Sequence, residues 1–254
     1  FGDFDAAYGG WDIEGEPYTT KDNTKFRWFR SRMLGGRTNH WGRISLRFGP
    51  DDFKRRSIDG IGEDWPIGYD EVAPFYDETD RLLGVFGTNE GLRNDPDGIF
   101  LPPPKPRLHE HMLKKANKNL GITTIPSRLS ILTKKINDDR GVCFYCQQCG
   151  RACMAYADFS SSSCLVNPAA KTGNLDIIYF AMAREILTDP KTGLCTGVSY
   201  IDTETLEEKS VRGNIVVLAA SACESARLLL NSKSPRFPEG LANSSGVVGK
   251  YLHY

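Results

Sequence analysis

The stretch "NIVVLAASACESARLLLNS", residues 214–232, passes from an apolar run directly into a helical pattern. The unbroken apolar run at 215–219 is typical of a strand that is covered on both faces. Ser221 and Glu224 have the spacing of a capping box, and the helix they would open has an apolar face made of Ala226, Leu229 and Leu230. A strand, a tight turn and a capped helix present backbone N–H groups to an anionic or polar ligand. The stretch therefore predicts an α/β fold.

The residues before this stretch show the alternating pattern of half-buried strands. Tight turns such as "DPKTG" separate four runs, at 175–182, 183–189, 197–204 and 207–213. We expect them to form a β-meander.

The first half of the chain has two helical segments. "WPIGYDEVAPFYDETDRLLGV", residues 65–85, predicts a helix with Asp70 as its cap, Pro74 in its first turn and Gly84 at its end. A second helix is expected at 109–120. His109 and His111 are two apart, a spacing that does not place two ligands on one helical face, so we expect them to face solvent.

The bulk composition excludes some classes of function. The 254 residues contain 40% hydrophobic and 25% charged residues, as in ordinary soluble globular proteins. Thirty-two basic residues balance thirty-two acidic ones, which favours neither nucleic acid nor an anionic membrane as a partner. No apolar run reaches the roughly 20 residues of a transmembrane helix.

Four of the seven cysteines lie close together. Cys143, Cys146, Cys149 and Cys153 have the spacing C-x2-C-x2-C-x3-C, with which thiolates can surround one iron–sulfur cluster. The first three could hold a three-iron cluster, or a four-iron cluster completed by Cys153 or Cys164. A zinc knuckle and free or structural thiols are the alternatives. Cys195 and Cys223 are expected to be small buried packing residues.

Three stretches together resemble the glucose–methanol–choline (GMC) family of FAD-dependent oxidoreductases. These are the strand–turn–helix at 214–232, the Trp-Pro helix at 65–85 and "RMLGGRTNHWGR" at 32–43, which resembles the family's flavin-contacting glycine loop. Their order and spacing also fit. The resemblance implies a Rossmann-like FAD-binding domain with a β-meander and an inserted substrate-binding domain. It assigns residues 1–45 and 155–254 to the FAD-binding domain. Residues 46–154 would form the insertion, which carries the cysteine-rich loop.

The resemblance also implies which residues contact FAD: Gly35, Gly36, Thr38, Asn39, His40, Trp41 and Ser221. Gly35 and Gly36 would let the backbone approach a flat ligand without an intervening Cβ. Arg32 and Arg43 would meet phosphate or ribityl oxygens, with solvated surface arginines as the alternative.

His40 resembles the histidine of the pyranose 2-oxidase loop, "GG-x-S-T-H-W", which is bonded covalently to the flavin. Here Thr38 and Asn39 stand in place of Ser-Thr. The alternative is a histidine that only packs against the flavin edge. The dinucleotide fingerprint of the family is expected upstream of this chain and the catalytic histidine downstream, so no catalytic residue is assigned and the isolated 254 residues are expected to be inactive.

The implied reaction is the oxidation of an alcohol group, on a sugar or polyol, by hydride transfer to flavin N5. An iron–sulfur cluster would favour a dehydrogenase that passes electrons to a partner protein or subunit. A hydrogen-peroxide-producing oxidase and a non-catalytic electron-transfer module are the alternatives.

Overall fold

The computed structural model describes residues 9–10, 13, 15–21, 24, 26, 28–149 and 153–251. The chain forms two compact units, residues 1–175 and 176–254. The predicted division into a flavin domain and an insertion stays a prediction.

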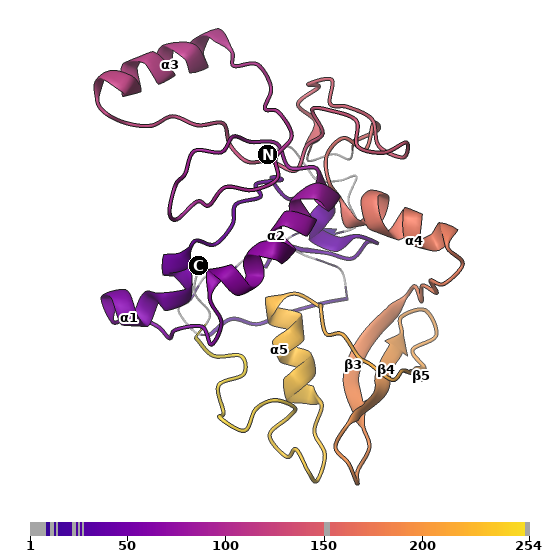
Figure 1. Ribbon diagram of the computed structural model, residues 1–254. Helices are drawn as coiled ribbons and strands as arrows, with labels where there is room; N and C mark the ends of the chain where they lie inside the picture. Colours follow the sequence, from indigo (N-terminus) through magenta and orange to yellow (C-terminus); the bar gives the residue numbers. More distant parts are fainter. Residues whose placement is uncertain are drawn as a thin grey trace. The chain divides into compact units, whose positions relative to one another are not determined.

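The first unit contains short helices joined by long connections (Figure 1). Two-residue strands β1 and β2 pair antiparallel. The elements are β1 (Gly9–Gly10), β2 (Arg30–Ser31), η1 (Gly36–Asn39), η2 (Pro50–Lys54), α1 (Arg55–Asp59), α2 (Tyr69–Leu83), α3 (Leu108–Asn119), the π-helix η4 (Ser162–Val166) and α4 (Asn167–Lys171).

Helix α2 confirms the prediction at 65–85, but its cap differs. Gly68 is the N-cap, and the Glu71 carboxylate accepts a hydrogen bond from the Gly68 N–H at 2.7 Å. Asp70, the predicted cap, already lies within the first turn, where its charge favours the helix N-terminus. Pro74 therefore stands inside the helix rather than in its first turn. Gly84 ends the helix with φ +74°, a left-handed conformation that glycine adopts without steric cost.

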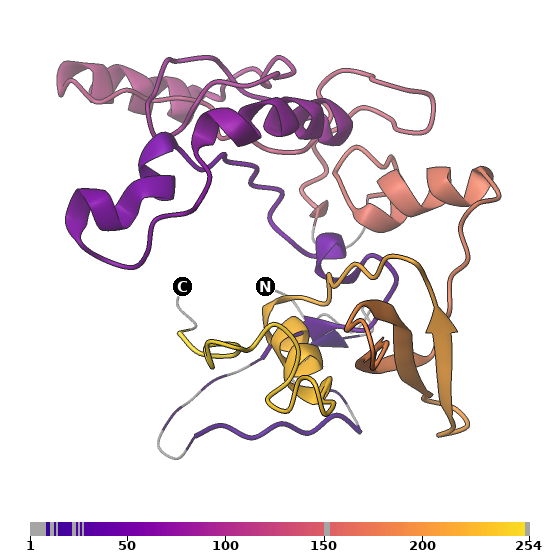
Figure 2. The same ribbon diagram turned by 60° about the horizontal axis from the view of Figure 1, so that its bottom comes forward.

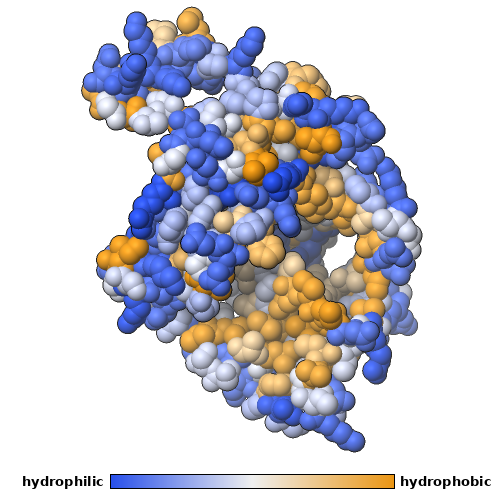
Figure 3. Space-filling model, in the orientation of Figure 1, coloured by the Kyte–Doolittle hydropathy of each residue, from blue (hydrophilic) through white to orange (hydrophobic). Residues whose placement is uncertain are grey.

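Helix α3 confirms the second predicted helix within one residue at each end. No residue of α3 is buried, and hydrophilic side chains cover most of it, with a few apolar ones among them (Figure 3). His109 and His111 are exposed, as expected.

The interior of the first unit is held by buried arginines as well as by apolar side chains. Arg47 pairs with Asp77 at 2.6 Å and with Asp80, and it donates a hydrogen bond to the Tyr69 hydroxyl. Arg47 and Asp80 are both buried, so this ion pair fastens the segment before η2 to α2. Arg43, Arg128 and Arg140 are also buried. A buried guanidinium is tolerated only where carboxylates or carbonyls replace its lost water.

The second unit is an antiparallel meander with one helix packed on it (Figure 1 and Figure 2). The strands β3 (Ala181–Thr188), β4 (Cys195–Asp202) and β5 (Glu208–Arg212) pair in sequence order, and α5 (Ala222–Asn231) contacts β3. The Ser232 hydroxyl accepts a hydrogen bond from the Ile186 N–H at 2.8 Å, which ties the end of α5 to β3. The meander is confirmed. The first two predicted strands, however, are replaced by β3 alone.

The predicted buried strand at 215–219 is wrong for the described structure. No described residue pairs with it, and Ile215 and Val217 are 83% and 82% exposed. An apolar run indicates that a segment needs cover, but a strand forms only when a neighbouring strand supplies the hydrogen-bond ladder. The apolar face of α5 also differs from prediction, because Leu228 is its buried residue.

The described residues contain helices, a two-stranded antiparallel pair and a three-stranded antiparallel sheet. Within the described ranges, no helix has both the length and the apolar content needed to cross a bilayer.

Candidate functional site

The glycine loop, residues 35–41, is built on two successive glycines with positive φ. Gly35 has φ +87° and Gly36 has φ +51°, and the chain then turns through the 3-10 helix η1. A Cβ on Gly35 would lie 2.8 Å from the Ser162 Cβ and 2.9 Å from the Asn39 Nδ2, so Gly35 makes room for the protein itself. A Cβ on Gly36 would meet nothing within 4 Å. Of the two glycines, Gly36 is the one that faces open space, where a ligand can approach.

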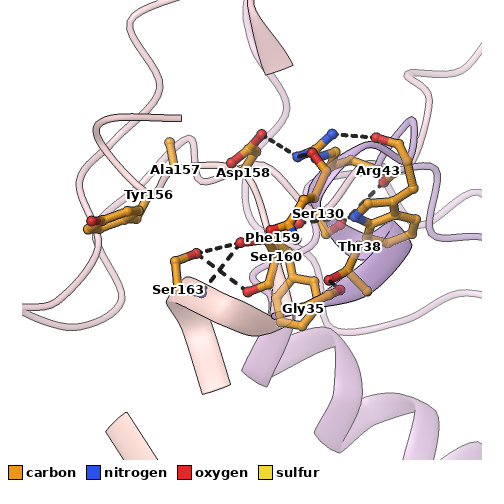
Figure 4. Close-up of polar contacts among 12 residues, drawn as sticks. Gly35, Thr38, Arg43, Ser130, Tyr156, Ala157, Asp158, Phe159, Ser160 and Ser163 are labelled. Atoms are coloured by element: carbon orange, nitrogen blue, oxygen red, sulfur yellow. Dashed lines mark hydrogen bonds and ion pairs between the residues drawn. The ribbon is translucent and has the colours of Figure 1, made fainter. Parts of the chain in front are cut away.

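The loop is fastened to a run of four serines, Ser160–Ser163, here called the serine segment (Figure 4). The Thr38 hydroxyl lies 2.8 Å from the Ser161 hydroxyl and accepts a hydrogen bond from the Ser161 N–H at 2.9 Å. The Ser162 hydroxyl donates to the Asn39 Oδ1 at 2.7 Å. The sequence interpretation overlooked this segment, although four consecutive serines before a helical run could have indicated it.

His40 and Trp41 end the glycine loop and are half-buried. The His40 ring packs edge-on against Phe29 with ring centres 5.9 Å apart, and its Nε2 lies 3.5 Å from the Ser31 hydroxyl. The Trp41 indole N–H donates to the Phe159 carbonyl at 3.0 Å. Trp41 therefore anchors the loop to the residue just before the serine segment.

Arg43 fits neither of its two predicted roles. It is 1% exposed, and its guanidinium pairs with the Asp158 carboxylate at 2.7 Å (Figure 4). The same guanidinium donates to the carbonyls of Trp41 and Asn39. Burial raises the pKa of Asp158, and the Arg43 charge opposes that rise. Arg32 pairs instead with Glu16 at 2.6 Å.

The cysteines of the predicted cluster surround one small cavity of about 20 Å³ next to this ion pair. That volume is room for about one water molecule. Cys143 accepts a hydrogen bond through its Sγ from the Tyr145 N–H at 3.3 Å. The cavity is lined by Cys143, Cys146, Cys149 and Cys153, together with Ile131, Phe144, Gln147, Gln148, Ala157 and Asp158.

The four sulfurs do not meet at a single point. No set of three metal-binding side chains suited to one ion is present among the described residues. In an iron–sulfur cluster the thiolates bind different irons, so they need not converge in this way. Burial, together with the nearby Asp158 carboxylate, raises the pKa of Cys149.

The other cysteines stand apart from this cavity. Cys164 is buried and donates through its Sγ to the Asp158 carbonyl at 3.8 Å. Cys195 is exposed and Cys223 is half-buried, so the prediction that both are buried packing residues is wrong.

Ser221 and Glu224 lie in the second unit and do not form the predicted capping box. Ser221 is the N-cap of α5 with φ +74°, but its side chain makes no capping hydrogen bond. Glu224 instead receives a hydrogen bond from Arg227 at 2.7 Å, one turn further along the helix. The positive φ directs the serine hydroxyl away from the N–H groups that a capping residue must reach.

Comparison with known proteins identifies the family. The model of the GMC oxidoreductase family matches residues 13–254, which is nearly the whole chain. The chain belongs to the GMC oxidoreductase family.

Characterised relatives include both dehydrogenases and an oxidase. The chain is 34% identical to 2-methyl-1,2-propanediol dehydrogenase of Mycolicibacterium austroafricanum over 86% of this chain and 40% of the relative. It is 31% identical to paromamine 6'-oxidase of Streptomyces fradiae over 96% of this chain and 42% of the relative. It is also 31% identical to the fructose dehydrogenase large subunit of Gluconobacter japonicus over 91% of this chain and 42% of the relative. The chain thus spans about two fifths of the length of these relatives.

Proposed function

We propose that this chain is part of an FAD-dependent enzyme that oxidises an alcohol group on a sugar or polyol. Membership of the GMC oxidoreductase family carries the proposal. The named activities of the relatives, on 2-methyl-1,2-propanediol, paromamine and fructose, agree with a CH–OH substrate. The inserted substrate-binding domain at 46–154 is part of the same proposal.

The glycine loop fits a flat cofactor on one side only. The positive φ and open flank of Gly36 support an approach of the flavin there, whereas Gly35, Thr38 and Asn39 hold the loop on the serine segment. When bound, the flavin supplies the hydride acceptor. His40 and Trp41 complete the proposed binding set in the first unit, and Ser221 is its member in the second. No residue of this chain is proposed as the proton-accepting base.

The proposal predicts that an alcohol substrate reduces the flavin in the full-length enzyme. Anaerobic addition of a panel of polyols and sugars should bleach the oxidised flavin absorption with at least one member. Adding back oxygen or an artificial one-electron acceptor then separates the two candidate activities. Faster reoxidation by the acceptor supports a dehydrogenase, whereas stoichiometric hydrogen peroxide supports the oxidase. A flavin that no alcohol in the panel bleaches contradicts the proposal.

His40 is proposed to bond covalently to the flavin. His40 belongs to the glycine loop, and Phe29 and Ser31 hold the orientation of its ring. Acid precipitation of the full-length holoprotein should leave the yellow colour in the pellet, and His40→Ala should release it into the supernatant. Release of all the colour from the unsubstituted protein would show that His40 only packs against the flavin.

Cys143, Cys146, Cys149 and Cys153 are proposed to bind an iron–sulfur cluster that passes electrons to an acceptor protein or subunit. The shared cavity and the N–H···S hydrogen bond to Cys143 support this proposal. The cavity of about 20 Å³ is too small to hold a cluster in the described conformation. Anaerobically purified full-length protein should contain iron and acid-labile sulfide, and Cys146→Ser should lower both, while Cys195→Ser should change neither. A flavin-loaded protein without iron would favour the oxidase.

A further inference from the structure

The side chain of Asn39 holds two carbonyl groups next to the Gly–Gly pair at the same time. Its Nδ2 donates to the Leu34 carbonyl at 2.9 Å and to the Gly36 carbonyl at 3.1 Å. Its Oδ1 accepts a hydrogen bond from the Ser162 hydroxyl at 2.7 Å. Turned the other way, the amide would place its Oδ1 against two carbonyl oxygens, and neither can donate to it. The hydrogen bond from Ser162 therefore favours the orientation in which Asn39 holds the loop.

The carbonyl between these two, that of Gly35, is also bonded to side chains. It accepts hydrogen bonds from the Thr38 hydroxyl and, at 3.2 Å, from the Ser161 hydroxyl. Three successive carbonyls, those of residues 34–36, thus receive side-chain donors. These donors come from η1 and from the serine segment, which lies more than 120 positions further along the chain.

A Gly–Gly pair needs such external restraints because its own backbone is loose. Glycine reaches left-handed and right-handed conformations at similar cost, and it loses more conformational freedom on ordering than any other residue. A ligand that binds a loose loop must supply the free energy of ordering it. A loop already held in its bound shape binds more tightly without any new contact. Because a Cβ on Gly36 would meet nothing within 4 Å, packing restrains this glycine little, and the Asn39 amide restrains its carbonyl.

We propose that Ser162, acting through Asn39, is a positioning residue that holds the glycine loop in the shape that accepts the flavin. This role rests on the proposed function, in which the flavin approaches Gly36. The contacts run from the Ser162 hydroxyl to the Asn39 amide, and from the amide to the Gly36 carbonyl. Loss of the hydroxyl removes the donor to Oδ1, so the amide can rotate away from the carbonyls and the Gly–Gly backbone loosens.

The test compares three substitutions in the full-length protein. Ser162→Ala keeps the Cβ that faces Gly35 and removes only the hydroxyl. Asn39→Ala removes the amide. Ser163→Ala is the matched control, because the hydroxyls of both serines contact Ser160. In the described part of the chain, the Ser163 hydroxyl does not bond to the glycine loop.

Two quantities are measured for each variant. The first is the FAD dissociation constant, obtained by titrating flavin-free protein and following the quenching of flavin fluorescence. For this titration every variant also carries His40→Ala, so that a covalent bond does not mask the affinity. Flavin per protein after gel filtration, with His40 intact, is the second readout of binding. The urea midpoint of unfolding is the measure of a purely structural effect.

We expect Ser162→Ala to weaken FAD binding about threefold to tenfold, which is the effect of losing one hydrogen bond. Ser163→Ala should leave FAD binding unchanged, while the two variants unfold at similar urea concentrations. Because Ser162 acts through Asn39, adding Ser162→Ala to Asn39→Ala should weaken binding no further.

Three results would overturn this role. They are a change below about twofold in Ser162→Ala, an equal loss in Ser163→Ala, and additive losses in the double variant with Asn39→Ala. Each of them leaves the proposed oxidoreductase intact as long as the full-length protein contains flavin. A full-length protein without flavin contradicts the proposed function itself.

Discussion

Replacing Arg47 with Met is expected to destabilise the first unit by about 3–5 kcal/mol, the usual cost of removing one partner of a buried ion pair. Asp80 is 5% exposed, and burial already raises its pKa against the opposing charge of Arg47. Without Arg47, the Asp80 carboxylate must take up a proton or stay charged in an apolar interior. Urea unfolding of the full-length protein, monitored by tryptophan fluorescence, measures the loss.

The double variant Arg47→Met, Asp80→Asn is the control for this mechanism. Because it removes both charges, it should recover part of the stability that Arg47→Met loses. Lys209→Met breaks a surface ion pair with Asp202 and should leave the unfolding midpoint nearly unchanged. A loss below about 1 kcal/mol for Arg47→Met would show that this network contributes no more than a surface ion pair.

The Gly35→Ala and Gly36→Ala variants should distinguish the glycine that lets the loop pack on the serine segment, Gly35, from the glycine that the flavin is proposed to approach, Gly36. Both place a Cβ on a left-handed backbone, which costs about 1–2 kcal/mol. In Gly35→Ala the Cβ also collides with Ser162, so the loop must leave the serine segment and both stability and FAD should be lost. In Gly36→Ala the Cβ enters open space, so the stability loss should stay within the backbone cost while FAD retention falls.

Gly60→Ala is the matched control for Gly36→Ala. Gly60 follows α1 with φ +77°, and a Cβ there also meets nothing within 4 Å. The two variants should lose similar stability, but only Gly36→Ala should lose FAD, measured as flavin per protein after gel filtration. Equal FAD content in Gly36→Ala and Gly60→Ala would mean that the flavin does not approach Gly36.

Local patterns in the sequence predicted the helices and the meander. Helix α2 follows from the spacing of its apolar residues and from Gly84, which ends it. The meander follows from period-two alternation between turns such as "DPKTG". These features succeed because neighbouring residues within one element decide them. The predicted cap of α2, Asp70, lies two residues after the observed cap, Gly68. Both residues fit a helix start, Asp70 through its own carboxylate and Gly68 through the hydrogen bond from its N–H to Glu71.

The candidate site was predicted only in part. The sequence singled out the glycine loop and the four cysteines, because glycine pairs and cysteine spacing are local signals. The hydrogen bonds between Thr38 and Ser161, the collision that requires glycine at position 35, and the Arg43–Asp158 pair join residues more than a hundred positions apart. Nothing in the sequence near Arg43 distinguishes it from a solvated arginine.

The sequence by itself determined the family, the positions of α2, α3 and α5, and the two stretches that carry the proposed chemistry. Periodicity, capping and residue spacing act over a few residues, so they can be recognised without the fold. Tertiary structure alone decided which arginines are buried, which glycine faces open space and whether the apolar run at 215–219 becomes a strand. Burial and strand pairing depend on what a distant segment brings to the same place, and a local pattern does not contain that information.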